Sequence, residues 1–320
     1  MLKTKRLGGS GRTYTDMVVR TETGEMPVGD CKEVCHDYAV SYIGGNAVTA
    51  LAFCARHGVP VDLLCQKGTD RTGKACHDAL AELGVNVYGA TIDKSPVSFI
   101  HASDSGERAM LRCRERHNHE NEEWIDFPHI DVTEYGAFHC DGHFPNVALD
   151  YVQRCRKAGI LTSLDGGGIR NNTDELLGFI DVAVVCRRMC EQMDKNTEAM
   201  LRYLRSKGCM IGGVTLGADG MYWYEGSGEI QHLPALNVPS AAVRDGTGCG
   251  DFFHGGYLYS YLTRQCAGWR EHFNFARRVA TNKLRFRGNE QCIVASSLED
   301  IVEYTRRFEA LPERSITLAA

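Results

Sequence analysis

The sequence predicts an α/β protein with a doubly wound, mainly parallel sheet flanked by helices. From residue 44 onward, short apolar runs alternate with segments of helical periodicity, and glycines end several of these helices. Two helix-free segments interrupt the alternation. Because strand–helix alternation produces parallel strands with crossover helices, both faces of the sheet should be covered. Ligands of such sheets bind beyond the carboxyl ends of the strands.

The alternating elements follow one another with few interruptions. Apolar residues at helical spacing predict helices, and short apolar runs predict buried strands. The predicted helices cover residues 47–56, 72–83, 146–159, 198–208 and 252–264, and the predicted strands cover 61–65, 85–90, 135–142, 160–167, 181–186, 209–217 and 221–224.

The two interrupting segments, residues 17–43 and about 95–114, have the pattern of paired strands without intervening helices. In the second, VSFIHA and ERAMLRC flank a glycine-containing turn, which predicts a hairpin. These strands are expected to form a small β lid over the site. Since no linker, repeat or low-complexity tract divides the chain, residues 1–320 are predicted to form a single domain.

The composition argues against several classes of protein. A net charge of -5 gives no support for a nucleic-acid partner. No apolar run approaches the roughly 20 residues that span a bilayer, and the basic N-terminus lacks the apolar stretch of a signal peptide. We therefore expect a cytoplasmic protein with no membrane partner.

The chain has 14 cysteines, several of them within apolar segments. Buried free thiols in a reducing compartment explain this placement better than disulfides do. Two CxxxC pairs, Cys31/Cys35 and Cys186/Cys190, have spacing of the kind that zinc ligands use. The pairs lie far apart between unrelated segments, so ordinary thiols are the favoured interpretation.

The strongest local signal is Asp245-Gly-Thr-Gly-Cys-Gly-Asp251, which precedes a helical run. A glycine-rich turn that leads into a helix N-terminus is an anion site, because free N–H groups and the helix dipole both favour negative charge. A carboxylate there has a natural task in accepting the proton of an attacking hydroxyl. The alternative is structural: aspartate is a good helix cap, and glycines permit tight turns.

Two further glycine turns are weaker signals. Gly44-Gly45-Asn46 enters a helix and could present the asparagine and backbone N–H groups to a ligand hydroxyl, although asparagine is also an ordinary cap. Thr215-Leu-Gly217-Ala-Asp-Gly220 lies between two predicted strands. This turn could line a nucleotide site, or it could serve only to connect the two strands.

Taken together, these segments resemble the ribokinase/PfkB family of carbohydrate kinases over residues 40–290. GGNAVTALAFCARHGV resembles the family's first signature, DGTGCGDFFHGG its second, and VTLGADG the strand and turn that line ATP. CDGHFPNVAL and LTSLDGG look closest to the ketohexokinase-like and bacterial sugar-kinase branches. The resemblance implies a ribokinase-like fold and an ATP-dependent transfer of the γ-phosphate to a sugar hydroxyl.

The resemblance also implies roles, position by position. Asp251 matches the catalytic base, and the backbone of Gly248, Cys249 and Gly250 matches the anion hole, with cysteine in place of the usual alanine. The positions that match sugar contacts are Asp16, Gly44, Gly45, Asn46 and Asp141. The positions that match contacts on the nucleotide side are Thr215, Gly217, Gly220, Asp245, Thr247 and Asn282.

ATP and Mg²⁺ are the cofactors that the resemblance implies, and a monovalent cation such as K⁺ is a further candidate. Three departures from the family pattern bear on these expectations. Many members carry Asn-x-x-Glu, which helps to organise magnesium, where this chain has Cys186-Arg-Arg-Met-Cys190-Glu191, so no magnesium ligand is assigned. Gly246 replaces a threonine in the loop of the monovalent cation, and MLKTKRLGG is a poor match to the family's apolar first strand.

Two alternative functions remain open at this stage. A nucleoside kinase of the same fold would use a pocket aromatic, such as Phe99 or Phe144, to stack on the base. A non-catalytic sugar-binding regulator would explain the missing Asn-x-x-Glu but not the retained Asp251. An acidic sugar would need a basic anchor, for which His143, Arg112 and Arg114 are candidates. Family members often pair through the lid strands, so a homodimer is expected.

Overall fold

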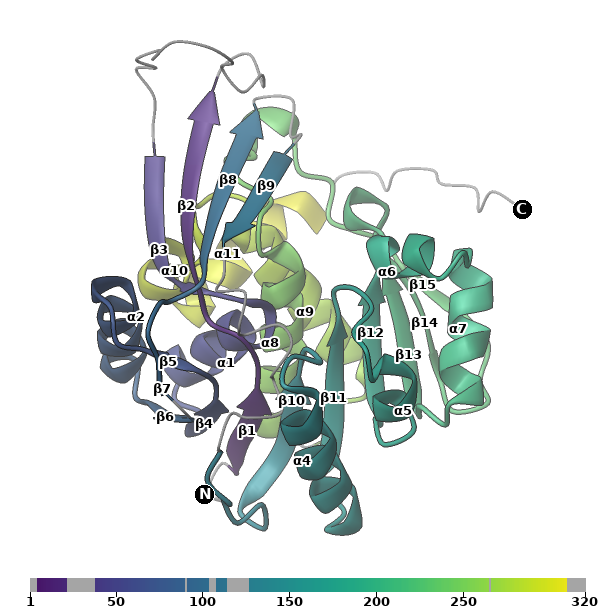
Figure 1. The fold of residues 1–320 in the computed structure, drawn as a ribbon. Coiled ribbons are helices and arrows are strands. Elements are labelled where there is room, and N and C mark those ends of the chain that lie inside the picture. The colour runs from purple at the N-terminus through teal and green to yellow at the C-terminus, as the bar shows by residue number, and fades with distance from the viewer. Residues whose placement is uncertain are drawn as a thin grey trace.

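The computed structural model describes residues 5–21, 38–89, 91–103, 108–113, 127–264 and 266–309. Its main sheet is composed of β1 (Arg6–Ser10), β4 (Val61–Leu64), β6 (Val85–Tyr88), β10 (Tyr135–Cys140), β11 (Leu161–Gly166), β12 (Val182–Cys186), β13 (Ile211–Thr215), β14 (Met221–Glu225) and β15 (Gln231–Leu233). These strands form a nine-stranded sheet in the order β15-β14-β13-β12-β11-β10-β1-β4-β6 (Figure 1). The seven strands from β13 to β6 in this order are parallel to one another. β14 pairs antiparallel with β13, and β15 pairs antiparallel with β14. The predicted doubly wound, mainly parallel fold is confirmed.

Helices cover both faces of this sheet. The helices are α1 (Asn46–Arg56), α2 (Arg71–Glu82), α4 (Pro145–Lys157), α5 (Thr173–Leu177), α6 (Arg187–Gln192), α7 (Thr197–Ser206), α8 (Cys249–Thr263), α9 (Trp269–Lys283), α10 (Asn289–Ala295) and α11 (Leu298–Glu309), with short 3-10 turns η2 (Gly217–Asp219) and η3 (Ser240–Ala242). One hydrophobic core lies between the sheet and α1, α8 and α9, and a second lies between the opposite face and α4 to α7. Consecutive residues of one strand, such as Leu63 and Leu64, enter different cores, as the pleat of a strand requires.

The first strand lies near the middle of the sheet although its sequence, RLGGS, is not an apolar run. A Cβ placed on Gly8 would lie 2.3 Å from the ring of Tyr135, and one on Gly9 would lie 2.6 Å from the carbonyl oxygen of His139. Neighbouring elements therefore fill the volume that larger side chains of β1 would occupy. This close approach explains why the usual apolar pattern is missing at this strand.

A second sheet is composed of β2 (Tyr14–Thr21), β3 (Tyr38–Gly44), β8 (Val97–Ser103) and β9 (Arg108–Cys113), in the order β3-β2-β8-β9. It extends beyond the helices at the top of Figure 1. β8 and β9 form the predicted antiparallel hairpin, whose turn falls outside the described residues. Where residues 17–43 and 95–114 are described, they supply these strands; a two-stranded pair, β5 (Lys67–Gly68) and β7 (Thr91–Ile92), lies apart from them.

The two faces of this small sheet differ in chemistry. Pairing places Ser41, Asp16, Ser98 and Arg112 in one row across the four strands, and Val40, Met17, Phe99 and Leu111 in the neighbouring row. Neighbouring rows face opposite ways. The polar row faces the candidate site, since Asp16 and Ser98 are buried, whereas Phe99 and Leu111 are 45% and 61% exposed.

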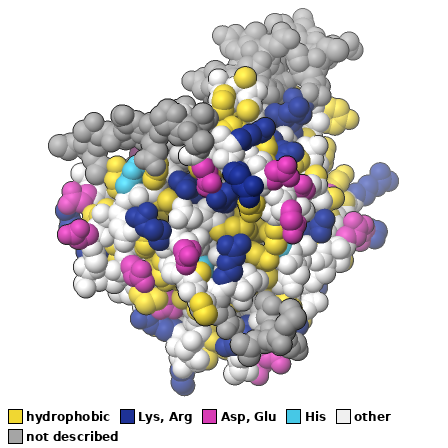
Figure 2. All heavy atoms as spheres, turned by 180° about the vertical axis from the view of Figure 1, so that it is seen from behind, with side chains coloured by type: hydrophobic (Ala, Val, Ile, Leu, Met, Phe, Trp, Pro, Cys, Tyr) yellow, Lys and Arg dark blue, Asp and Glu magenta, His cyan; other side chains and the backbone are white. Residues whose placement is uncertain are grey.

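On the face that Figure 2 shows, Lys and Arg side chains are interspersed with Asp and Glu. The cysteines of the described residues are free thiols, and Cys31 and Cys35 lie outside those residues. Within the described chain, the helices are too short or too polar to cross a bilayer.

Helix α8 contains two glycines that allow it to pack closely on two neighbours. A Cβ on Gly255 would lie 2.9 Å from the carbonyl oxygen of Ala50 in α1, and one on Gly256 would lie 2.6 Å from Cα of Ala276 in α9. Glycine normally lowers helix stability, so its presence here is explained by backbone contact between helices. The α1–α8–α9 group is the platform that carries the glycine turn at Asp245–Asp251.

We predict that Gly256→Ala lowers the free energy of unfolding by about 1–3 kcal/mol, because a methyl group would overlap the α9 backbone. Gly268→Ala is the matched control, since a Cβ at that helix start meets no atom within 4 Å; it should change stability by less than roughly 1 kcal/mol. Urea denaturation of both variants is the measurement. Equal effects would show that the α8–α9 contact does not need glycine.

Candidate active site

The glycine turn opens the N-terminus of α8. Gly248 is the residue before the helix and has a φ of 81°, and no side chain caps this end. A Cβ on Gly248 would lie 2.1 Å from Oδ1 of Asn289, so both the backbone conformation and the neighbour require glycine. Gly246 and Gly250 are exposed, and a Cβ on either would meet no atom within 4 Å. The N–H of Cys249 makes a long contact of 3.5 Å with the carbonyl oxygen of Gly246, and a helix N-terminus without a side-chain cap can bind an anion.

Asp251 lies in the first turn of α8 and is half-buried. The helix dipole favours a negative charge in this turn. The structure thus brings together the residues predicted for the anion hole and the base, Gly248 to Asp251, at one helix end.

The first glycine turn lies against β2. A Cβ on Gly44 would lie 2.5 Å from Oδ2 of Asp16, and one on Gly45, whose φ is 102°, would lie 2.0 Å from the carbonyl oxygen of Arg12. Burial raises the pKa of Asp16 to about 6, against the opposing effects of the Ser98 hydrogen bond and the Arg112 charge. The Asp245 carboxylate also contributes to raising this pKa, which shows that β2 lies close to the α8 turn.

Asn46, at the start of α1, faces the end of β11. Its Nδ2 donates to Oδ1 of Asp165 over 3.3 Å, and a Cβ on Gly167 would lie 2.4 Å from Nδ2. Burial and the neighbouring Asp141 raise the pKa of Asp165. Asp165 was not identified from the sequence as a site residue; its position at a strand end before three glycines was the available signal.

Asp141, at the end of β10, has both carboxylate oxygens close to protein N–H groups. Oδ1 accepts from the backbone N and Nδ1 of His143, and Oδ2 lies 3.4 Å from the N of Ala47 in α1. Burial alone would raise the pKa of Asp141, but the contacts with His143 and the charge of Arg170 hold it well below its usual range. Asp141 therefore caps the start of α1 across the sheet and fixes the turn that carries Asn46.

A buried group with the chemistry of metal ligands lies beside Asp165. His139, Asp165 and His254 each offer one ligand atom, and these atoms lie within 4.8 Å of one another. Desolvation holds the pKa of both histidines below the usual value, so their imidazoles are neutral. Their Nδ1 atoms are engaged by Ser163 and by Tyr257. Two nitrogens and one oxygen do not match the all-oxygen ligands of Mg²⁺, so this group is not a site for the ion of an ATP complex.

The predicted nucleotide turn follows β13. Thr215 ends this strand, and its hydroxyl donates to the carbonyl of Val185 over 3.3 Å. Gly217 and Gly220 have φ of 64° and 80°. A Cβ on Gly220 would lie 2.2 Å from the carbonyl oxygen of Leu233, whereas Gly217 faces open space. Gly217 is thus the member of this turn that leaves room for a ligand.

Arg187 binds this nucleotide turn and was not identified from the sequence. It stands directly after Cys186, where many family members have Asn-x-x-Glu, and Nη2 donates to the carbonyl of Leu216 and to Oδ2 of Asp219 over 3.2 and 2.7 Å. The residue that follows the β12 end therefore holds the turn in place.

The other predicted nucleotide-side residues are packed within the protein. Asn282 is 1% exposed, and its Nδ2 donates to Oγ of Ser296 over 2.8 Å. Oδ1 of Asp245 accepts from the N of Thr247 over 2.8 Å. Asn282 thus connects α9 to the end of α10, and Asp245 holds the backbone of Thr247.

The aromatic and basic candidates also have defined positions. Phe99 lies on the exposed face of the small sheet, opposite to Asp16, and Phe144 is 1% exposed beneath the guanidinium of Arg12, which lies 5.5 Å from its ring centre. Nδ1 of His143 is bound to Oδ1 of Asp141 over 2.9 Å. Arg112 lies across from Ser98 on the polar row, and Arg114 lies outside the described residues.

A glycine-rich helix start with a carboxylate in its first turn is an arrangement that can bind an anionic group such as a phosphate. The model of the pfkB family of carbohydrate kinases matches residues 36–293, and the chain belongs to this family. The resemblance stated from the motifs is confirmed. The protein is an ATP-dependent phosphotransferase of the sugar- and nucleoside-kinase type.

Individual relatives show the same relationship. Aminoimidazole riboside kinase of Salmonella typhimurium is 26% identical over 249 residues, which cover 70% of this chain and 75% of that protein. Ribokinase of Haemophilus influenzae is 22% identical over 284 residues, covering 85% and 89%. The structure of Arabidopsis thaliana ribokinase complexed with ribose and ATP has a TM-score of 0.73 at 17% identity and covers 95% of this chain and 99% of that one.

Because its pKa is raised, Asp16 should destabilise the fold when the pH is high enough to ionise its carboxyl group. Folding favours the protonated carboxyl, so the favourable contribution of this group is present near pH 4 and is lost as the pH rises through about 6. Asp16→Asn should therefore gain stability relative to the wild type between pH 4 and pH 7, by up to about 3 kcal/mol. Urea denaturation across this range is the measurement, and a pH-independent difference would contradict the assignment.

Proposed function

We propose that the protein is a carbohydrate kinase that transfers the γ-phosphate of ATP to a sugar hydroxyl, with Asp251 as the general base. The observation that carries this proposal is the glycine-rich N-terminus of α8, which has no side-chain cap and carries the Asp251 carboxyl group in its first turn. A protein that only binds sugars would gain nothing from placing a carboxylate beside a phosphate. The position of this carboxylate therefore favours a catalytic function over that of a non-catalytic regulator.

The sugar side and the phosphate side are adjacent in the fold. Asn289 joins them, since its Nδ2 donates to Thr49 of α1 over 3.1 Å while its Oδ1 lies against Gly248. Asn46 starts the same helix, α1, and Asp16 lies against Gly44 just before it. A hydroxyl held by Asp16 and Asn46 would thus approach the start of α8 from the α1 side.

In the proposed mechanism, Asp251 accepts the proton of the sugar hydroxyl as that oxygen attacks the γ-phosphorus. The N–H groups of Gly248, Cys249 and Gly250 stabilise the charge on the transferring phosphoryl group, which then leaves ADP. Backbone donors perform this task, so a cysteine at 249 is compatible with it. Mg²⁺, when bound with ATP, would neutralise the phosphate charge, and the phosphates themselves would provide much of its ligand shell.

The nucleotide would lie along the β13 end, against the turn that begins at Gly217. Arg187 holds this turn through Asp219 and Leu216. Thr247 and Asp245 support the phosphate loop, and Asn282 supports α10. The use of ATP supports the cytoplasmic location expected from the sequence.

A sugar is favoured over a nucleoside as the acceptor. Stacking on a base needs an aromatic face in the pocket, and the two candidates lie elsewhere: Phe99 on the outer face of the small sheet and Phe144 in the core. A nucleoside kinase remains the second candidate, because aminoimidazole riboside kinase is among the relatives. ADP release from Mg-ATP with a panel of ketoses, aldoses, sugar acids and nucleosides would decide between them.

We predict that Asp251→Asn lowers kcat by a factor of about 10²–10⁴ with little change in ATP affinity, because the variant keeps the shape of the site but cannot accept a proton. ADP release with the best panel substrate gives kcat, and titration calorimetry gives the affinity for ATP. Glu191→Gln, which alters an exposed carboxylate of α6, is the control and should leave kcat unchanged. Near-normal turnover of Asp251→Asn would exclude it as the base.

We also propose that the small sheet acts as a lid and pairs two copies of the chain. Its outer face exposes a row of apolar side chains, Val40, Phe99 and Leu111, with Tyr38 76% exposed beside them. Such a contiguous apolar surface is typical of an interface. A two-fold contact between identical faces would cover it in both copies.

We predict that the wild-type protein is a dimer in light scattering and that Phe99→Asp combined with Leu111→Asp converts it to a monomer, because two charges would be buried in the contact. Ile169→Asp and Val294→Asp change apolar residues that are exposed outside the small sheet and serve as controls. A monomeric wild type, or a dimer that survives both charges, would contradict the proposed interface.

A further inference from the structure

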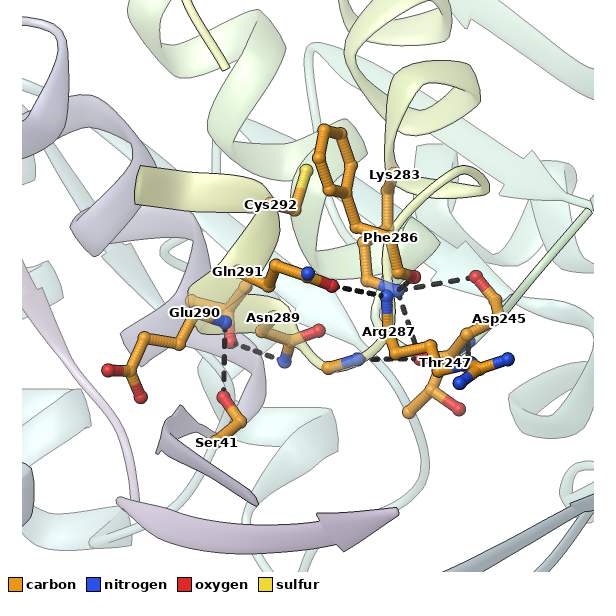
Figure 3. A network of polar contacts seen from close by, with 12 residues as sticks. Ser41, Asp245, Thr247, Lys283, Phe286, Arg287, Asn289, Glu290, Gln291 and Cys292 are labelled. Carbon is orange, nitrogen blue, oxygen red and sulfur yellow. Dashed lines mark hydrogen bonds and ion pairs between the residues drawn. The ribbon is translucent and has the colours of Figure 1, made fainter. Parts of the chain in front are cut away.

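A buried ammonium group lies behind the glycine turn. Lys283, the last residue of α9, is 0% exposed. Its Nζ donates to the carbonyl of Asp245 over 3.2 Å, to Oδ2 of Asp245 over 3.1 Å and to the carbonyl of Phe286 over 3.1 Å. An ammonium group has three protons, so each of them has one oxygen partner. Figure 3 shows these contacts converging on Nζ.

We propose that this ammonium is a built-in replacement for a monovalent cation, and that the enzyme therefore does not need K⁺. The inference rests on the function proposed above. Two backbone carbonyls and one carboxylate are the oxygen donors that a hard monovalent cation would use. The loop that begins at Asp245 is where a monovalent cation was a candidate from the sequence, and a covalently attached cation already lies between its oxygens.

The hydrogen bonds of Asp245 connect the ammonium to the anion hole. Oδ1 accepts from the N of Thr247 over 2.8 Å, and Oδ2 accepts from the N of Gly288 over 3.0 Å. Thr247 directly precedes Gly248. Burial alone would raise the pKa of Asp245, but Lys283 and the donors of Thr247 outweigh it and hold the pKa below its usual value. The carboxylate that shapes the turn is thus kept ionised by a partner that cannot diffuse away.

Lys283 also connects the turn to the loop between α9 and α10. Phe286 belongs to this loop, and Gly288 and Asn289 follow it. The N of Arg244 donates to the carbonyl of Leu284 over 2.7 Å, so backbone contacts support the same junction. Since Asn289 lies against Gly248, the ammonium fixes the anion hole from two sides. Lys283 is therefore a positioning residue, and it does not touch the substrates.

An ordinary structural ion pair would share the burial but not the response to cations. If the ammonium only balances charge, its removal weakens the protein whatever salt is present. If it stands in the place of a monovalent cation, truncation to alanine opens that place, and a soluble cation can enter it. Lys283→Met fills the same volume without charge and should not be rescued. The two variants therefore separate a cation site from general packing.

The experiment measures turnover of Mg-ATP and the accepted sugar in tetramethylammonium chloride, KCl or methylammonium chloride at equal ionic strength. The wild type should vary less than about two-fold among the three salts. Lys283→Ala should lose at least about 10-fold in kcat in tetramethylammonium chloride, and K⁺ or methylammonium should restore most of the loss. Lys283→Met should lose as much without rescue, and Lys74→Ala, at an exposed lysine, should match the wild type.

Wild-type activation by K⁺ of several-fold would overturn the inference, and so would a Lys283→Ala variant that is unaffected or that no cation restores. Thermal unfolding in the same salts supplies a readout that does not need turnover. The midpoint of the wild type should be indifferent to K⁺, and that of Lys283→Ala should rise with it. If the wild type phosphorylates no acceptor, the proposed function fails while these midpoints still test the cation site. If Lys283→Ala does not fold, a rise of the wild-type midpoint specific to K⁺ still contradicts the inference, and its indifference supports it.

Discussion

The ion pair between Lys283 and Asp245 is the interaction on which the conformation of the Asp245–Asp251 turn depends. Burying both charges is costly, and the cost is offset because each ammonium proton and both carboxylate oxygens have partners. Those partners belong to the two segments that flank the start of α8. The pair therefore holds the turn in one conformation, as the proposed anion hole would require. Preorganised donors of this kind need not reorganise during the reaction.

Close approach of neighbouring elements is the second constraint on the structure. Glycines permit it within the sheet, between two helices and at the turn before α8. Gly8 and Gly9 leave room beside β1 for the Tyr135 ring and the His139 carbonyl of β10, Gly256 lets α8 touch α9, and Gly248 lets Asn289 lie against the turn. Each contact brings the platform helices and the central strands closer together than side chains would permit. The site is thus compact because the elements that carry it are packed backbone to backbone.

Much of this organisation could be predicted from the sequence. The alternation of apolar runs and helical segments gave the sheet, and the Asp245–Asp251 turn gave the helix start, because both are local patterns. Lys283, Arg187 and Asp165 could not be predicted, since their partners lie 38, 32 and 119 residues away along the chain. Only the fold shows that Asn282 and Asp141 make their contacts within the protein. β1 was hard to identify because its neighbours supply the apolar volume that its own side chains lack.

The small sheet links substrate recognition to assembly through the alternation of its side chains. Asp16 and Met17 are adjacent in β2, so one faces the site and the other belongs to the outer row with Val40 and Phe99. A partner that covers the outer row would contact the same four strands, including the one that carries Asp16. The buried carboxylate has a raised pKa and costs stability when ionised, and packing on the opposite face can offset that cost. The small sheet could then tolerate a buried carboxylate that costs stability because its opposite face is covered.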